Sequence, residues 1–312
     1  MRGISFDVNQ GEVLGIVGES GSGKSVTSLS IMGLLQHPGR VVDGEIFFQD
    51  QDILSYGKRR MRRVRGKEIA MIFQDPMTSL NPVYTVGNQI MEMLQEHEDI
   101  GKGEAKRRAI EMLRMVGIPS PEKRIHNYPH EFSGGQRQRI GIARALAVNP
   151  EFIVCDEPIS ALDVSIQAQV VNMLEDLQRE FGLTYLFIAH DLSMVRHISN
   201  RIGVMYLGKL VEVGDSEEIY QNHLHPYTEA LLSSVPLPDP ELAHRSEPIM
   251  LQGDIPSPID PPSGCRFRTR CPYATQLCAE QEPPLTEVGS NHAVACHRVT
   301  PARGNEEKGG IL

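Results

Sequence analysis

Short apolar runs alternate with longer amphipathic stretches over the first two thirds of the chain. Six runs have the length and the β-branched or aromatic content typical of strands, namely EVLGIVG, GEIFFQ, EIAMIFQ, FIVCDEP, TYLFIAH and IGVMYLG. Helical patterns follow Lys24, cover residues 103–116, follow Gly134 and cover residues 164–181. This alternation predicts an α/β domain with a largely parallel sheet.

The pattern changes near Ser234. Eight prolines fall between Pro236 and Pro262, which predicts an extended linker or wrapping segment. Four of the five cysteines follow in the last fifth of the chain. We therefore expect a first domain over residues 1–234 and a second region over residues 235–312.

Composition narrows the class of protein. Among the 312 residues, 40% are hydrophobic and 23% are charged, which is typical of a globular domain. The sequence contains no apolar run of about 18 residues, the length that would predict a membrane span. The first residues show no signal-peptide pattern, and the net charge of −9 argues against a nucleic-acid partner. The basic stretch 57–67 is interpreted as a solvated helix face, with contact to acidic lipids or a membrane partner as the alternative.

One stretch carries a phosphate-binding pattern. Residues 18–25 are GESGSGKS and fit G-x-x-x-x-G-K-[ST] at every fixed position, with a predicted strand before them and a predicted helix after them. Glycines let backbone N–H groups turn toward a phosphate, and the helix adds its positive N-terminal end. This context disfavours the alternative of a glycine-rich turn without a ligand. The expected nucleotide-binding residues are Gly18, Glu19, Ser20, Gly21, Ser22, Gly23, Lys24, Ser25 and Val26.

Two further stretches suit the same chemistry. Lys24 is expected to reach the β- and γ-phosphates of ATP and Ser25 to bind Mg²⁺. The strand FIVCDEP ends in two acids whose side chains face opposite ways, so Asp156 suits the Mg²⁺ shell and Glu157 the attacking water. A predicted helix begins at Ser133, Gly134 and Gly135, and its N-terminus offers a second anion site. A second site is explicable if each chain offers one to its own nucleotide and the other to the nucleotide of a partner subunit.

At this point the sequence resembles the ATP-binding subunits of ABC transporters, motif by motif, over about residues 3–214. FSGGQ resembles the family signature, usually LSGGQ, with Phe132 as a departure; MIFQDP resembles the Q-loop, SALD the D-loop and FIAHD the H-loop. The resemblance implies a P-loop NTPase fold with a RecA-like core, a small antiparallel β subdomain, an inserted helical subdomain at about residues 76–150 and a C-terminal cysteine-bearing extension.

The resemblance also implies an ATPase mechanism. Two subunits close head to tail on two ATP-Mg, and closure drives a membrane partner that docks near DPMTSLNPVYTVGNQI. Glu157 is then the base, and His190 contacts the γ-phosphate and holds Glu157 and the water in place. Gln74 senses Mg²⁺ and the γ-phosphate, and Ser25, Gln74 and Asp156 bind the Mg²⁺. The residues that face the partner's ATP are Ser133, Gly134, Gly135 and Gln136, and those of the D-loop are Ser160, Ala161, Leu162 and Asp163.

A narrower resemblance points to the dipeptide and oligopeptide importers. QDPMTSLNP, SALDVSIQAQ, LHPYTEALLSSVP and PSGCRFRTRCPYA are all similar to their ATPases. The resemblance implies a second homologous ATPase subunit (identical or different), two membrane permease subunits, an external peptide-binding protein and a place at the cytoplasmic face of the inner membrane. Such importers use two different ATPase subunits. The part of this chain up to about Tyr128 resembles one type and the part from FSGGQRQR resembles the other, so a hybrid of the two types remains an alternative.

The clustered cysteines predict a metal site. Cys265, Cys271, Cys278 and Cys296 have the spacing C-x5-C-x6-C-x17-C, which suits a [4Fe–4S] cluster better than a zinc ribbon built from C-x2-C pairs. The family resemblance implies the same cluster. A Zn²⁺ site of three cysteines and His297 is the runner-up, and unliganded cysteines are the remaining alternative. Metal binding is expected to help fold this small, proline-rich region.

The start of the chain departs from the family. The aromatic residue that stacks on adenine, about two dozen positions before Lys24, falls at or before Met1, and the first edge strand falls with it. Loss of one stack worth about 1–3 kcal/mol predicts an affinity for ATP about ten- to hundredfold lower. We expect a version with added upstream residues to bind ATP-Mg more tightly, and equal affinities would contradict this.

Three other functions remain as alternatives. A related importer ATPase for nickel or another small solute shares these motifs. A DNA-handling ATPase of this type is disfavoured by the acidic charge and by the compact segment joining the two halves of the site. A regulatory member that binds ATP without hydrolysing it is disfavoured because both Glu157 and His190 are present.

Overall fold

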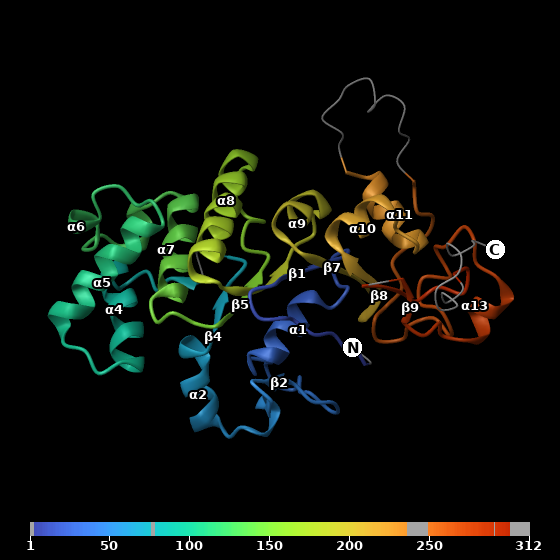
Figure 1. Ribbon diagram of the computed structural model, residues 1–312, viewed down its shortest axis with the longest axis horizontal. Helices are drawn as coiled ribbons and strands as arrows, with labels where there is room; N and C mark the ends of the chain where they lie inside the picture. The colour runs from blue at the N-terminus through green and yellow to red at the C-terminus, as the bar shows by residue number, and fades with distance from the viewer. Residues whose placement is uncertain (1–2, 76–78, 236–248, 290, 300–312) are drawn as a thin grey trace. The chain divides into compact units, whose positions relative to one another are not determined.

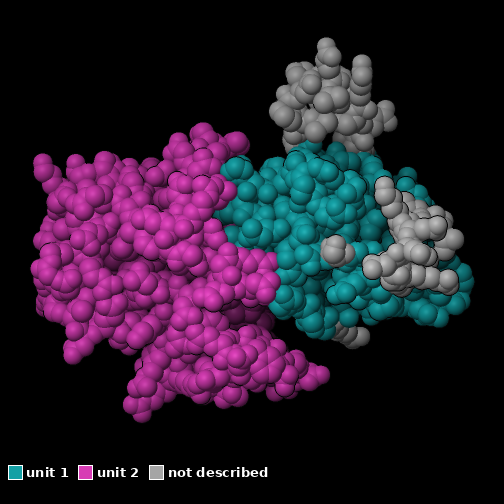
Figure 2. Space-filling view, in the orientation of Figure 1, with its two compact units in different colours: residues 1–7, 13–24, 189–312 teal, residues 8–12, 25–188 magenta. Residues whose placement is uncertain are grey.

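The structure is a computed structural model that describes residues 3–75, 79–235, 249–289 and 291–299. The chain divides into two compact units, coloured separately in Figure 2. Unit 1 comprises residues 1–7, 13–24 and 189–312, and unit 2 comprises residues 8–12 and 25–188. Most of the proline-rich segment, residues 236–248, lies outside the described residues.

Unit 2 contains three parallel strands with β5 in the centre. β4 pairs with β5 through Ile69 opposite Phe152, and β5 pairs with β6 through Phe152 opposite Thr184. Nearly every residue of the three strands is buried, as continuous apolar runs in a covered parallel sheet predict. The strands are β4 (Ile69–Ile72), β5 (Phe152–Asp156) and β6 (Thr184–Ile188), and a separate antiparallel pair is formed by β2 (Phe47–Phe48) and β3 (Gln51–Asp52).

Helices make up the rest of unit 2. In α5, Ala105, Ala109 and Leu113 recur at every fourth position and are fully buried, so this face packs on α4 and α7 (Figure 1). The helices are α1 (Lys24–Ile31, whose first residue closes unit 1), α2 (Lys58–Lys67), α4 (Val86–His97), α5 (Lys102–Met115), α6 (Pro121–Arg124), α7 (Gly134–Leu146) and α8 (Val164–Phe181), with 3₁₀ turns at Ile53–Ser55 and Pro129–Glu131.

The basic stretch forms α2, as the sequence predicted. Met61 and Val64 are buried, whereas most of its cationic side chains are exposed. Arg65 departs from helical geometry and donates to the backbone carbonyls of Met32 and Gly33. The solvated-face interpretation therefore fits the structure.

Unit 1 contains a mixed sheet of five strands. β1 runs parallel to β7, and β7, β8, β10 and β9 follow as antiparallel neighbours. The strands are β1 (Val13–Val17), β7 (Arg201–Tyr206), β8 (Lys209–Asp215), β9 (Thr286–Gly289) and β10 (His292–Val294), and the helices are α9 (Leu192–Ile198), α10 (Ser216–Gln221), α11 (Pro226–Ser233) and α13 (Gln276–Glu280). Strands β9 and β10, which the sequence did not indicate, extend this sheet from the cysteine-bearing region.

The strands and helices named from the sequence are confirmed, although GEIFFQ forms a strand only at Phe47 and Phe48. None of the helices in the described ranges combines the length and the apolar character that crossing a bilayer requires.

Candidate functional site

The phosphate-loop residues of unit 1 connect β1 to α1. Gly18, Gly21 and Gly23 all have positive φ, at 154°, 79° and 109°, so the backbone turns sharply between strand and helix. A Cβ added at Gly18 would lie 2.1 Å from the carbonyl oxygen of Met205, which only glycine avoids. The loop therefore has the backbone shape that lets consecutive N–H groups converge on an anion.

Lys24 is folded back over this loop. Its Nζ donates to the carbonyl oxygens of Gly18 at 2.8 Å and Glu19 at 3.2 Å, and the residue is only 4% exposed. A buried ammonium held by backbone carbonyls arches across the turn where a phosphate is expected. The Lys24 ammonium therefore lies over the loop to which the sequence assigns phosphate binding.

Glu19 has partners that sequence reasoning missed. Its carboxylate accepts two hydrogen bonds from Arg270, at 2.6 Å and 3.0 Å, and its backbone N–H donates to the hydroxyl of Tyr227 at 2.8 Å. The carboxylate raises the pKa of the Arg270 guanidinium, and burial raises the pKa of Tyr227. The sequence feature that could have indicated this contact is the arginine-rich stretch RFRTRCPY, residues 266–273. It indicates cationic side chains but not the carboxylate with which they pair.

In unit 2, Ser25 meets the first acid of the FIVCDEP strand. Ser25 Oγ donates to Asp156 Oδ1 at 3.0 Å, although 131 residues separate them. Asp156 is the last residue of β5 and is 6% exposed. A hydroxyl and a carboxylate at this distance are the two protein ligands expected of a nucleotide-bound Mg²⁺.

The second acid has a different partner. Glu157 has a positive φ of 47°, and its Oε2 accepts a hydrogen bond from Gln74 Nε2 at 2.6 Å. The structure therefore brings Asp156 to Ser25 and Glu157 to Gln74, as two separate pairs. Such a carboxylate can accept a proton from water, because its second oxygen has further lone pairs.

The signature and D-loop residues lie at the starts of two neighbouring helices. Ser133 caps α7, its Oγ accepting from Gln136 N and the Gln136 side chain accepting from Ser133 N, both at 3.3 Å. A Cβ on Gly135 would lie 2.5 Å from Ile166 of α8, which explains this glycine. Asp163 begins α8 and is exposed, as is Ala161, whereas Ser160 Oγ donates to the carbonyl of Glu157 at 3.1 Å.

Phe132 occupies the position of the usual leucine without disturbing the helix start. The side chain is 4% exposed, and the guanidinium of Arg124 lies 4.4 Å from the ring centroid. The ring is therefore buried just before α7 and makes a cation–π contact with Arg124. His190, two residues after β6, is exposed.

The four clustered cysteines lie in unit 1. Cys265 N donates to the carbonyl of Cys278 at 2.8 Å. Burial first, and then the charges of the other three thiolates, raises the pKa of Cys265 to about 11. Burial likewise raises the pKa of Cys271 and Cys296. Four thiols that influence one another match the donor set of an iron–sulfur or zinc site, but no metal-binding group of three or more side chains forms within the described residues.

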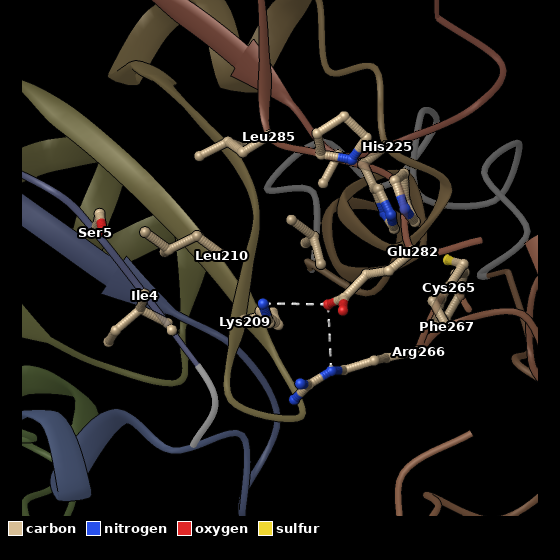
Figure 3. Close-up of a pocket in the computed structure, with 15 residues that line it drawn as sticks. Ile4, Ser5, Lys209, Leu210, His225, Cys265, Arg266, Phe267, Glu282 and Leu285 are labelled. Atoms are coloured by element: carbon tan, nitrogen blue, oxygen red, sulfur yellow. Dashed lines mark ion pairs between the residues drawn. The ribbon is translucent and has the colours of Figure 1, made fainter. Parts of the chain in front are cut away.

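A cavity of about 380 Å³ lies beside this region (Figure 3). Glu282 projects into it and pairs with Lys209 Nζ at 3.3 Å and Arg266 Nε at 3.6 Å. Arg266 also donates to the carbonyl of Leu207. The two ion pairs and the hydrogen bond of Arg266 link the cysteine-bearing region to Leu207 and Lys209, at the start of β8.

Two family models match the chain. The model described as ABC transporter matches residues 1–160, and the model described as Oligopeptide/dipeptide transporter, C-terminal region, matches residues 211–278.

Similar proteins span nearly the full chain. The oligopeptide transport ATP-binding protein AppF of Bacillus subtilis is 53% identical over 296 residues, covering 95% of this chain and 88% of that protein. OppF of Salmonella typhimurium is 51% identical and covers 96% and 87%, and the dipeptide transport ATP-binding protein DppD of Haemophilus influenzae is 50% identical and covers 97% and 90%.

Solved structures agree with the fold. The dimeric ATP-binding cassette MJ0796, bound to ADP and Pi after hydrolysis, superposes with a TM-score of 0.61 and 28% identity, covering 68% of this chain and 89% of that chain. CbiO1 of Clostridium perfringens, part of the ABC transporter complex cbiONQ, gives a TM-score of 0.64 and 26% identity, covering 78% and 90%.

Proposed function

The chain belongs to the ABC transporter ATP-binding family and is an ATPase, and from this premise we propose that it energises import of di- and oligopeptides through a membrane transporter. The observation that carries the proposal is the combination on one chain of the phosphate loop with a C-terminal region of the oligopeptide/dipeptide type at residues 211–278. Peptide transport is named for all three relatives described above.

Each site residue then has a role in hydrolysis. Lys24 contacts the β- and γ-phosphates, while the Ser25–Asp156 pair holds Mg²⁺, which supplies charge neutralisation at the phosphates. Gln74 joins that metal shell and holds Glu157, which takes the proton of the attacking water. His190 contacts the γ-phosphate.

We further propose that the working unit is a dimer with a second homologous ATPase subunit. Ser133–Gln136 and Ser160–Asp163 present polar backbone and side-chain groups at the starts of α7 and α8, where a partner's ATP can bind. MJ0796, a relative by structure, is a dimer. Each chain thus completes its partner's site rather than its own.

Docking to two permease subunits, at the cytoplasmic face of the inner membrane, completes this proposal, with an external peptide-binding protein acting indirectly. The segment after Gln74 supports it, because Val83 and Tyr84 are 70% and 53% exposed ahead of α4. Two adjacent exposed side chains of this kind offer apolar area that a membrane partner can cover. Residues 76–78 of the same segment lie outside the described residues.

The cysteine-bearing region belongs to the proposal as well. Cys265, Cys271, Cys278 and Cys296 hold a [4Fe–4S] cluster, with Zn²⁺ as the competing occupant, and the cluster acts structurally. We place the boundary of the ATPase domain at residue 234, with the helical subdomain at about residues 76–150 and the extension at residues 235–312. The clustering of four cysteines within 32 residues supports this proposal, and a backbone hydrogen bond of 2.8 Å joins Cys265 to Cys278.

Peptide uptake in cells tests the function. We expect deletion of the gene in an amino-acid auxotroph to abolish growth on peptides that contain the required amino acid, and we expect the wild-type gene to restore it. Glu157→Gln should not restore growth, because it removes the proposed base. Nickel uptake measured in the same strains is expected to stay unchanged. Lost nickel uptake with normal peptide uptake would assign the chain to a nickel importer instead.

A further inference from the structure

A short segment between the first two cysteines reaches the phosphate loop. Residues 266–270 are RFRTR, and both Arg266 and Arg270 make a side-chain hydrogen bond to a residue outside the extension, Leu207 and Glu19 respectively. All the contacts described below lie within unit 1. The extension is therefore in physical contact with the loop that binds nucleotide, although about 250 residues separate them in sequence.

The first contact is direct. Arg270 Nη1 lies 2.6 Å from Glu19 Oε2, and Arg270 Nη2 lies 3.0 Å from Glu19 Oε1, a two-pronged pairing of guanidinium and carboxylate. The Arg270 side chain is 7% exposed and that of Glu19 25%, so water competes little for either group. This arrangement fixes both the position and the direction of the Glu19 side chain.

Two further contacts reinforce it. Arg266 donates to the carbonyl of Leu207, and the next residue, Gly208, donates its N–H to Ser22 of the phosphate loop at 2.6 Å. Phe267 packs against Tyr227 with ring centroids 5.4 Å apart, and the hydroxyl of Tyr227 accepts from the backbone N–H of Glu19. The segment thus contacts the loop directly at Glu19, and indirectly at Glu19 through Tyr227 and at Ser22 through Leu207 and Gly208.

The charge of Glu19 gives the first contact a consequence for ATP. An acidic side chain within a phosphate-binding loop repels a triphosphate, and the repulsion is strong where the groups are shielded from water. The cation of Arg270 cancels this charge. Without its partner, Arg270 would be a buried cation and Glu19 a partly buried anion, and only the anion opposes ATP binding.

We propose that Arg270 is a positioning residue for ATP, which fixes Glu19 and neutralises it, so that the C-terminal extension sets the affinity of the phosphate loop. The inference rests on the proposed nucleotide site at Gly18–Ser25. It gives the extension a role in the ATPase cycle beyond its own folding.

Steady-state kinetics of ATP hydrolysis by the full chain test the inference. We expect Arg270→Gln to raise the KM for ATP about tenfold, because Glu19 then faces the triphosphate as an uncompensated anion, while kcat stays within about twofold. Glu19→Gln should lower the KM below the wild-type value, because it removes the anion and leaves the Arg270 cation beside the loop. The double variant should recover most of the affinity lost in Arg270→Gln, and Arg270→Lys should lie between.

Two controls separate this inference from its premises. Arg268→Gln alters a neighbouring arginine whose side chain bonds to Ser263, within the described part of the extension, so its KM should equal that of wild type. Lys24→Ala tests the nucleotide site itself: if it hydrolyses ATP as wild type does, the proposed site is wrong whatever Arg270 does. Thermal unfolding of each variant is measured alongside.

An unchanged KM in Arg270→Gln would overturn the inference. So would a raised KM that the double variant fails to recover, because the contact would then be structural only. Should Arg270→Gln fail to fold, Glu19→Gln and Arg270→Lys decide: a raised KM in the former, or wild-type KM in the latter, would contradict the role of Arg270.

Discussion

Replacing Glu157 by glutamine is expected to reduce kcat for ATP hydrolysis about a hundredfold or more while nucleotide binding survives. General bases contribute about 10²–10⁴ to rates, and an amide cannot take the proton of water. The variant is nearly isosteric and keeps an oxygen that can accept the Gln74 hydrogen bond. Phosphate release under saturating ATP-Mg, with binding measured by calorimetry, checks both parts. Because ATP stays bound, this variant should also accumulate as a nucleotide-dependent dimer in size-exclusion chromatography.

Glu151→Gln provides a matched control. Glu151 immediately precedes β5, at the end opposite Glu157, and bonds to Gln49 at 2.6 Å. Glu151 and Glu157 carry the same charge and flank the same strand, but Glu151 has no role in the proposed chemistry. The kcat of Glu151→Gln should therefore equal that of wild type. Equal rates for Glu157→Gln and wild type would show that another group activates water.

Loss of one clustered cysteine is expected to remove the metal and destabilise the extension. The chain purified without oxygen should contain iron and sulfide in equal amounts and absorb visible light, and Cys271→Ser should lose both signals. Because the extension is small and a structural metal contributes its binding energy to folding, the variant should also unfold at a lower temperature. Metal analysis, absorption spectra and calorimetry measure these effects.

Cys155→Ser is the control for this experiment. Cys155 lies fully buried in β5 of unit 2, whereas the four clustered cysteines belong to unit 1, so we expect this thiol not to be a ligand. Its iron content should match wild type. If the wild-type chain contained zinc in place of iron, the Zn²⁺ site of three cysteines and His297 would replace the proposed cluster. A wild-type chain with neither metal would contradict the proposal of a metal site.

Local patterns fixed much of the fold in advance. The phosphate loop could be named from eight consecutive residues, because its glycines and the following helix act over neighbouring positions. The buried strands β4, β5 and β6 were equally clear, since continuous apolar runs are typical of a covered parallel sheet. The short strands β9 and β10 escaped prediction because they form only by pairing with β8 and with each other.

The sequence by itself determined which residue types were available for ATP chemistry: a buried-strand acid pair, a glycine-rich turn with Lys24, and a cysteine cluster. The sequence already assigned Ser25 and Asp156 to one Mg²⁺, but the direct contacts between side chains, above all that of Glu19 with Arg270, come only from the tertiary structure. Ser25 pairs with Asp156, Gln74 with Glu157, and Glu19 with Arg270 across 131, 83 and 251 residues. No periodicity or spacing encodes such pairs, because contacts between distant segments depend on how strands align and helices pack. The link from the extension to the phosphate loop is therefore visible in the folded chain alone.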